Sequence, residues 1–316
     1  MTPKLRQLLS FAAALLAIGL LTWHYCFRSY ASIPGIYGGA THAEVEERLR
    51  PLAQPKRAPR QGDWLHTYPE AGQSFETYIN SQPVRRDAQR RAIYLCLVGD
   101  FSPTQLRILE ITQEYMALVF QCPVTILKRE SLDSIPSSAQ RRHPSEGQLQ
   151  LLTSHFLYDS LKADRPDDAL AYVAFTSADL WTKDPDGRDW NYVFGQADLK
   201  NRLGVWSLAR FGNPESSPES FAECLTLTLG TATHETGHIL GILHCVYFQC
   251  NMNGANNLDE ARRTPLPFCP ICLRKLCWNL KVDPELYLRK LLEFSAKHQL
   301  ADSVKWYESA IAALKR

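Results

Sequence analysis

Residues 234–272 decide both the chemistry and the fold of this chain, and their sequence is HETGHILGILHCVYFQCNMNGANNLDEARRTPLPFCPIC. The stretch begins with His234 and His238, spaced as H-E-x-x-H. Residues four apart on an α-helix project from one face, so both imidazoles can reach one zinc ion at about 2.0–2.1 Å. Gly241 can adopt a positive φ and end the helix, which would return His244 as a third ligand. Three protein ligands leave one position open for water, as in catalytic zinc sites.

Glu235 directly follows the first histidine and is placed to hold a water at that open position. Bound zinc polarises a carbonyl group and lowers the pKa of water toward about 7. The pattern therefore predicts hydrolysis by a zinc-activated water. An alternative is a catalytically weak or inactive zinc-stabilised protein-interaction module, which docks through its C-terminal helices. An intact Glu235 argues against that alternative.

Closely spaced cysteines indicate a second metal site. Cys245 and Cys250 form one pair, and Cys269 and Cys272 form another. Two pairs of thiolates are the usual ligands of a closed, structural zinc site, so we expect two zinc ions per chain, one catalytic and one structural. Two disulfides are the alternative if the domain lies in an oxidising compartment. Cys277, just past the cluster, is interpreted as a partly buried thiol.

Composition excludes several classes of protein. The chain has 316 residues, of which 45% are hydrophobic and 22% charged, so it is neither mainly disordered nor a multi-span membrane protein. Its 35 Lys and Arg against 33 Asp and Glu give a net charge of +2. Nucleic-acid binders usually carry a stronger positive bias, so no nucleic-acid partner is expected and a zinc-ribbon function is disfavoured.

The N-terminal part differs from the rest. Lys4 and Arg6 precede an apolar run at residues 8–23, which aromatic residues extend to residue 27. Residues 1–31 are predicted to be an anchor or signal segment, with possible membrane contact through residues 8–27. Membrane association by this single segment is the favoured localisation, and a secreted or organellar protein after its cleavage is the alternative. Residues 32–61, rich in Gly, Pro and Arg, are predicted to be a linker with one short helix.

The remaining chain alternates between apolar runs and helical periodicity, which favours an α+β fold with a twisted mixed sheet. We expect a catalytic domain at residues 62–282 and a C-terminal helical segment at residues 283–316. The predicted strands are residues 92–98, 124–127, 169–175, 192–194 and 205–209. The predicted helices are residues 42–49, 104–119, 147–162, 221–240, one starting at Pro284, and 301–314.

The residues quoted above resemble the archaemetzincins, a metzincin-clan family of zinc peptidases. The family pattern is HExxHxxGxxHC, then C-x-M, then CPxC, and the stretch matches each of these positions. The likeness extends to the segment from Asp63 through YPEA at residues 68–71 and to WNYVFGQA at residues 190–197. It covers roughly residues 60–315 and is closest to the archaemetzincin-2 type.

The resemblance implies a metzincin-like domain with an active-site helix and a small lower subdomain across a cleft from the sheet. Met252 would be the Met-turn residue beneath the catalytic ligands, and residues 205–209 would be the edge strand along which a peptide substrate lies. The resemblance also implies hydrolysis of peptide bonds, with Glu235 as general base. The catalytic zinc would be bound by His234, His238 and His244, and the structural zinc by Cys245, Cys250, Cys269 and Cys272. The natural substrate, the choice between endopeptidase and aminopeptidase action, and the oligomeric state stay open.

Overall fold

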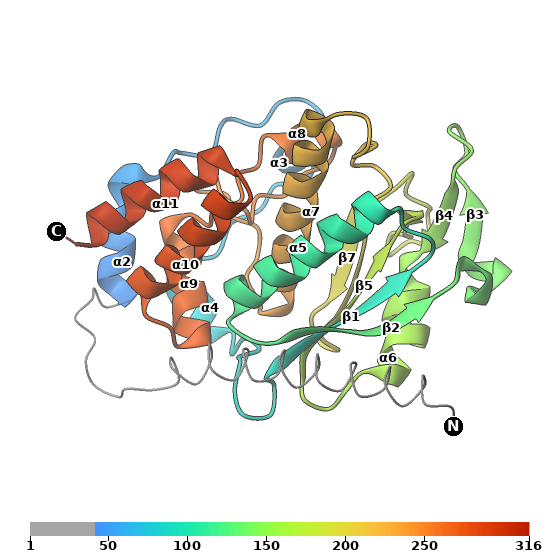
Figure 1. Ribbon diagram of the computed structural model, residues 1–316, viewed down its shortest axis with the longest axis horizontal. Helices are drawn as coiled ribbons and strands as arrows, with labels where there is room; N and C mark the ends of the chain where they lie inside the picture. Colours follow the sequence, from blue (N-terminus) through green and yellow to red (C-terminus); the bar gives the residue numbers. More distant parts are fainter. Residues whose placement is uncertain (1–41, 316) are drawn as a thin grey trace, which may run out of the picture. The chain divides into compact units, whose positions relative to one another are not determined.

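A five-stranded mixed sheet supports the site in the part of the chain that the structure, a computed structural model, describes, which is residues 42–315 (Figure 1). The strand order is β2-β1-β5-β8-β7, and β7 pairs antiparallel with β8 while the other pairs are parallel. The strands are β1 (Ala92–Val98), β2 (Val124–Glu130), β5 (Ala169–Thr176), β7 (Gly195–Asp198) and β8 (Leu203–Ser207). The predicted mixed α/β class is confirmed, as are the strands at β1, β2 and β5.

Helices cover both faces of this sheet. Alternate side chains of β1 point to opposite faces. Ile93 packs in the cluster that includes α5 (Pro103–Phe120) and α7 (Pro218–Ile239), whereas Cys96 packs in the cluster on the other face. That second face is covered by the π-helical turn His155–Ser160 and by α6 (Leu161–Asp164). The predicted helices near α5 and α7 are therefore confirmed.

The prediction of one helix at residues 147–162 is wrong in its first part. Its first part is strand β4 (Leu149–Leu152), which pairs with β3 (Gln140–Arg142) and β6 (Asp179–Trp181) in a small three-stranded sheet. Helical structure begins at residue 153 and continues through the π-helical turn into α6, so the second part of the prediction is confirmed. Pairing with two distant strands satisfies the backbone of β4, and this tertiary contact outweighs the local helical periodicity.

The C-terminal helices pack on the same body. They are α9 (Pro270–Leu280), α10 (Pro284–Lys297) and α11 (Ala301–Leu314), which follow one another along the chain (Figure 1). The Tyr287 hydroxyl donates to the Val119 carbonyl oxygen at 3.0 Å, which joins α10 to α5. The helices predicted to start at Pro284 and at residue 301 are confirmed.

Part of the predicted linker belongs to the folded unit. Helix α2 (His42–Leu49) forms as expected, but the side chains of Val45 and Leu49 are fully buried. Arg48 donates to the Leu314 carbonyl oxygen at 2.8 Å, which ties α2 to the end of α11. Burial of these two apolar side chains lowers the free energy of the folded state, so α2 packs on the domain. The linker prediction is therefore wrong for this helix.

The substrate-strand prediction also needs correction. Strand β8 lies between β5 and β7 and therefore cannot be the edge strand; β7 is the edge on this side of the sheet. The polar sequence GQAD of β7 gave no strand signal. The strand predicted at residues 192–194 does not form, because only Val193 makes an isolated bridge there, with Leu180. The anchor or signal segment, including residues 8–27, lies outside the described residues. Within residues 42–315, no helix is long and apolar enough to cross a membrane.

Candidate active site

The last turns of α7 and the loop after it bring the three predicted histidines together. His234 and His238 lie on α7, and Gly241 follows the helix with a φ of +82°. This left-handed conformation turns the chain so that His244 faces the other two rings. One ligand atom from each histidine lies within 4.8 Å of the others. The expected role of Gly241 as the pivot between helix and loop is therefore confirmed.

Hydrogen bonds fix the tautomers of the two helical histidines. His234 Nδ1 lies 2.8 Å from the Asn251 carbonyl oxygen, and His238 Nδ1 lies 2.7 Å from the Ile242 carbonyl oxygen. A carbonyl oxygen can only accept, so both Nδ1 atoms carry the proton and both Nε2 atoms present lone pairs. These Nε2 atoms are 3.0 Å apart, close to the roughly 3.3 Å between two ligands of one tetrahedral zinc. Facing lone pairs at this distance fit a bound cation.

The electrostatics of the site agree with this donor set. Burial, together with the neighbouring His244, lowers the pKa of His234 to about 3, and burial lowers that of His238 well below its ordinary value. Both rings are therefore neutral, which is the form that binds metal. Burial also raises the pKa of Glu235 to about 7, so this carboxyl group can accept or release a proton near neutral pH.

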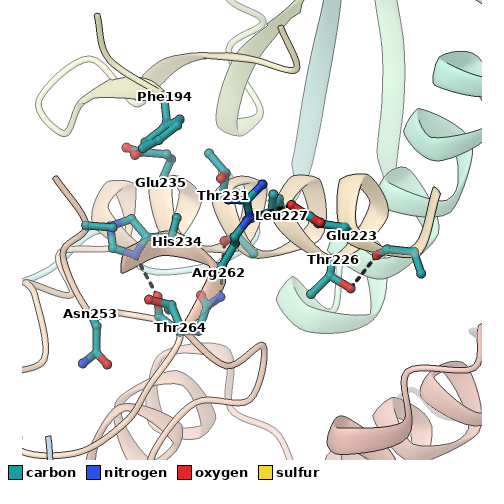
Figure 2. A pocket seen from close by; sticks show the side chains of 15 residues that line it. Phe194, Glu223, Thr226, Leu227, Thr231, His234, Glu235, Asn253, Arg262 and Thr264 are labelled. Carbon is teal, nitrogen blue, oxygen red and sulfur yellow. Dashed lines mark hydrogen bonds and ion pairs between the residues drawn. The ribbon is translucent and has the colours of Figure 1, made fainter. Parts of the chain in front are cut away.

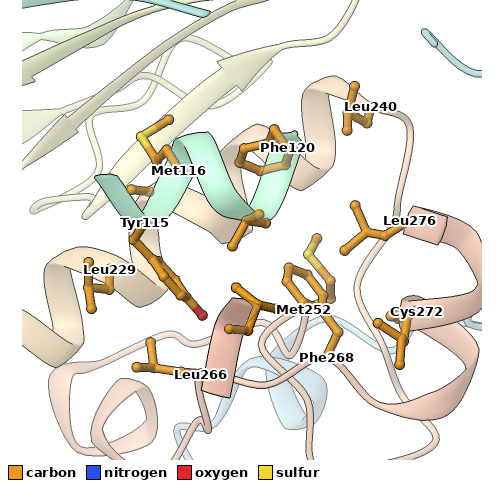
Figure 3. Packing of buried hydrophobic residues seen from close by; sticks show 14 of the residues in the cluster. Tyr115, Met116, Phe120, Leu229, Leu240, Met252, Leu266, Phe268, Cys272 and Leu276 are labelled. Carbon is orange, nitrogen blue, oxygen red and sulfur yellow. The ribbon is translucent and has the colours of Figure 1, made fainter. Parts of the chain in front are cut away.

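Met252 lies beneath the helix that carries the ligands. Its side chain is fully buried in the hydrophobic cluster that also contains Phe268 and Leu276 (Figure 3). A Cβ atom built on Gly237 would lie 2.7 Å from the Met252 sulfur, so the thioether packs directly against α7 between the two histidines. The preceding residue, Asn251, provides the carbonyl oxygen that fixes His234. Met252 is therefore packed against the turn of α7 that carries His234 and His238, and its role as a Met-turn residue stays a prediction.

The third histidine has a partner that the motif did not predict. His244 Nδ1 lies 2.9 and 3.1 Å from the two carboxylate oxygens of Glu70. Burial opposes ionisation of Glu70, but hydrogen bonds from His244 and Trp64 outweigh it and lower the pKa of this carboxyl group. The Trp64 ring also packs edge-on against His244, with ring centroids 4.9 Å apart. The only sequence signal was the YPEA segment at residues 68–71, which carried a family likeness and no role.

A buried polar network holds the loop between α7 and His244. The Gln73 side chain donates to the Gly241 carbonyl oxygen at 3.0 Å and accepts from the Leu243 amide at 3.2 Å. Lys275, which is only 1% exposed, donates to both the backbone and side-chain oxygens of Gln73. The Tyr78 hydroxyl donates to the Leu240 carbonyl oxygen at 3.0 Å. The segment before the sheet thus shapes the site, although no metal-binding pattern marks it.

The four predicted cysteines form a second, fully buried cluster. Their sulfur atoms all lie within 4.8 Å of one another, and Cys245 Sγ is 3.6 Å from Cys269 Sγ. Two sulfurs on one tetrahedral zinc would be roughly 3.8 Å apart, whereas a disulfide needs about 2.05 Å. The cysteines within residues 42–315 are all free thiols. Cys269 is the N-cap residue of α9 and Cys272 lies in its first turn, whereas Cys277 lies further along the helix and is fully buried.

A cavity of about 480 Å³ opens beside the histidines along α7 (Figure 2). Its walls include His234 and Glu235 at one end and Leu227 in the middle. At the far end, Arg262 Nε and a carboxylate oxygen of Glu223 form an ion pair at 2.6 Å. A larger cavity of about 980 Å³ shares part of this far wall, including Arg262. The site therefore joins a titratable carboxyl group to a pocket large enough for one side chain.

Comparison with known proteins gives the following likenesses. The model of Peptidase family M54 matches residues 124–277. Archaemetzincin-2 of Mus musculus is 32% identical over 260 residues, which cover 71% of this chain and 70% of that protein. Archaemetzincin-2 of Pongo abelii is 34% identical over 249 residues, covering 68% and 66%. The crystal structure of archaemetzincin from Methanopyrus kandleri has 27% identity and a TM-score of 0.48, and covers 62% of this chain and 98% of that one.

Proposed function

This chain belongs to the archaemetzincin family and is a zinc metallopeptidase that acts on peptides or proteins, and on that premise we propose that Glu235 is its general base. The observation that carries the proposal is the neighbourhood of Glu235. It directly follows His234 and precedes His238 along α7, the unprotonated Nε2 atoms of these two rings are 3.0 Å apart, and burial brings the pKa of Glu235 to about 7. A carboxyl group with this pKa can take a proton from an attacking water and return it to the leaving amine.

His234, His238 and His244 would hold the catalytic zinc. When bound, zinc supplies a Lewis acid that polarises the scissile carbonyl and makes water more acidic. The chain itself orients the ring ligands through the hydrogen bonds to their Nδ1 atoms. Met252 supports the helix from below and keeps its two ligands at a fixed separation.

The edge strand β7 is the proposed site for the substrate backbone. A Cβ atom on Gly195, the first residue of β7, would lie 3.4 Å from the carboxyl carbon of Glu235. A peptide added to this edge would pair its main chain with β7 and bring a carbonyl group to the base. One side chain of the peptide would enter the 480 Å³ cavity, whose polar end is formed by Glu223 and Arg262.

Replacement of Glu235 by glutamine tests the base. Peptide hydrolysis by the zinc-loaded protein should fall at least about 100-fold, while zinc content stays unchanged because the ligands remain. Glu219→Gln is the matched control, since it removes an exposed carboxylate from the first turn of the same helix, away from the cavity and the histidines. Equal activity of Glu235→Gln and the wild-type protein would refute the proposal.

We also propose that the four cysteines bind a structural zinc, which gives two ions per chain. Support comes from the 3.6 Å separation of the Cys245 and Cys269 sulfurs, which is too long for a disulfide, and from the convergence of four buried sulfurs within 4.8 Å of one another. Elemental mass spectrometry of the protein purified without added zinc should find about two zinc ions per chain. His238→Ala should lose one ion and keep the other. A single ion, lost in His238→Ala, would contradict the structural site.

A further inference from the structure

The three histidines are not held alike. His234 and His238 each donate from Nδ1 to a neutral backbone carbonyl, from Asn251 and Ile242 respectively. His244 is held by a carboxylate, that of Glu70, which is 174 residues away in the sequence. His244 is also the ligand that no helix carries. Its ring orientation therefore depends on a side-chain partner more than that of the other two.

Glu70 is itself held in place. The Trp64 indole nitrogen donates to Glu70 Oε1 at 2.9 Å, and this same oxygen lies nearest to His244. The Trp64 amide donates to the buried carboxylate of Glu260 at 2.8 Å. The indole ring of Trp64 packs directly against Gly254, because a Cβ atom on this glycine would lie 2.6 Å from Cδ1 of the ring. A chain of contacts thus runs from the core through Trp64 and Glu70 to the ligand.

We propose that Glu70 is a positioning residue for the catalytic metal: it fixes the ring of His244 and adds negative charge behind it, and Trp64 keeps Glu70 in that position. A carboxylate behind an imidazole raises the basicity of the ligating nitrogen and keeps the correct tautomer. The proposal rests on the proposed function, because it requires His244 to be a ligand. It adds a residue that lies outside the matched peptidase region at residues 124–277.

Zinc affinity of the histidine site tests the proposal without reference to activity. We would titrate the full-length, zinc-loaded protein with a colorimetric chelator and follow the ion that His238→Ala lacks. Glu70→Ala should weaken binding of this ion by about 10- to 100-fold. Glu70→Gln should weaken it less, because one amide oxygen can still accept both hydrogen bonds while the charge is lost. Glu76→Gln, which alters an exposed carboxylate of the same segment, should leave affinity unchanged.

A double-mutant cycle separates positioning from a general loss of structure. If Glu70 acts through His244, then Glu70→Ala should have no further effect on zinc affinity in a His244→Ala background. Additive losses would overturn the proposal, as would a Glu70→Ala protein that binds zinc within twofold of wild type. Trp64→Phe keeps the ring contact but removes the donor, and should weaken binding severalfold.

Failure of the proposed function gives a different result. A wild-type protein that binds zinc and shows the Glu70 effect without hydrolysing peptides would reject Glu235 as a working base and leave the role of Glu70 supported. Conversely, if the wild-type protein hydrolyses peptides and Glu70→Ala does not change zinc affinity, the role of Glu70 is overturned and that of Glu235 is not. Loss of zinc from Glu70→Ala without loss from His244→Ala would overturn it too, because the effect would then bypass the ligand.

Discussion

Replacement of Gly241 by alanine should destabilise the fold by roughly 2–5 kcal/mol and loosen the histidine site. Two costs add at this position. The φ of +82° is unfavourable for any residue with a Cβ atom, which costs about 1–2 kcal/mol. The added Cβ would also lie 2.9 Å from Cβ of Pro83, about 1 Å inside ordinary carbon contact, and such overpacking costs roughly 1–3 kcal/mol.

Gly187 provides a matched control. Its φ is also +82°, but a Cβ atom there would meet nothing within 4 Å. Gly187→Ala should therefore show only the backbone cost of about 1–2 kcal/mol. The difference between the two variants isolates the contact of Gly241 with Pro83. Zinc affinity should fall only in Gly241→Ala, because only this glycine precedes the loop that presents His244.

Urea unfolding of both variants, with zinc present, measures the free energies of unfolding from the shift in midpoint at constant slope. Chelator titration of the same proteins measures binding at the histidines. If Gly241→Ala were no less stable than Gly187→Ala and bound zinc normally, the loop could relax around the new methyl group. That result would refute the view that Gly241 fixes the return of the chain to the site.

Three further outcomes are expected. Met252→Ala should lower the free energy of unfolding by about 2–5 kcal/mol, because it leaves a cavity beneath α7, whereas Met252→Leu should cost less than about 1.5 kcal/mol in the same urea assay. The double variant Cys269→Ser/Cys272→Ser should lose zinc from the cysteine cluster, measured by elemental mass spectrometry, and should unfold at a lower temperature than wild type. Arg262→Ala should change the preference among peptides that differ in one side chain, because Arg262 lines both cavities, while its half-exposed ion pair adds no more than about 1 kcal/mol to stability.

Local spacing was enough to predict which ligand residues would meet. His234 and His238 are one helical turn apart, and Gly241 needs only its own freedom in φ to bring His244 back. The buried strands β1 and β5 were also predictable, since an uninterrupted apolar run fits a strand that is covered on both faces. In each case the determining interactions lie within a few residues along the chain.

Long-range contacts were not predictable in this way. Glu70 and Gln73 act on a loop about 170 residues away, and their own surroundings in the sequence contain no periodicity that reveals this. Lys275 is charged yet almost fully buried, which composition alone would assign to the surface. Strand β7 has no apolar pattern. It is a strand because its backbone pairs with β8, which its own sequence does not reveal. Such features depend on the finished fold.

The two clusters are joined by a single peptide bond, since His244 and Cys245 are consecutive. The Cys245 amide donates to the Met252 carbonyl oxygen at 2.7 Å, and Asn251, the residue before Met252, holds His234 through its own carbonyl oxygen. Cys250 directly precedes Asn251, just as Cys245 directly follows His244. The cysteine cluster is therefore bonded to both residues through the backbone. An ion bound by the cysteines therefore restricts the positions of His244 and Asn251 together. We expect loss of the structural ion to weaken binding at the histidines, whereas loss of the catalytic ion should leave the buried cysteine cluster intact.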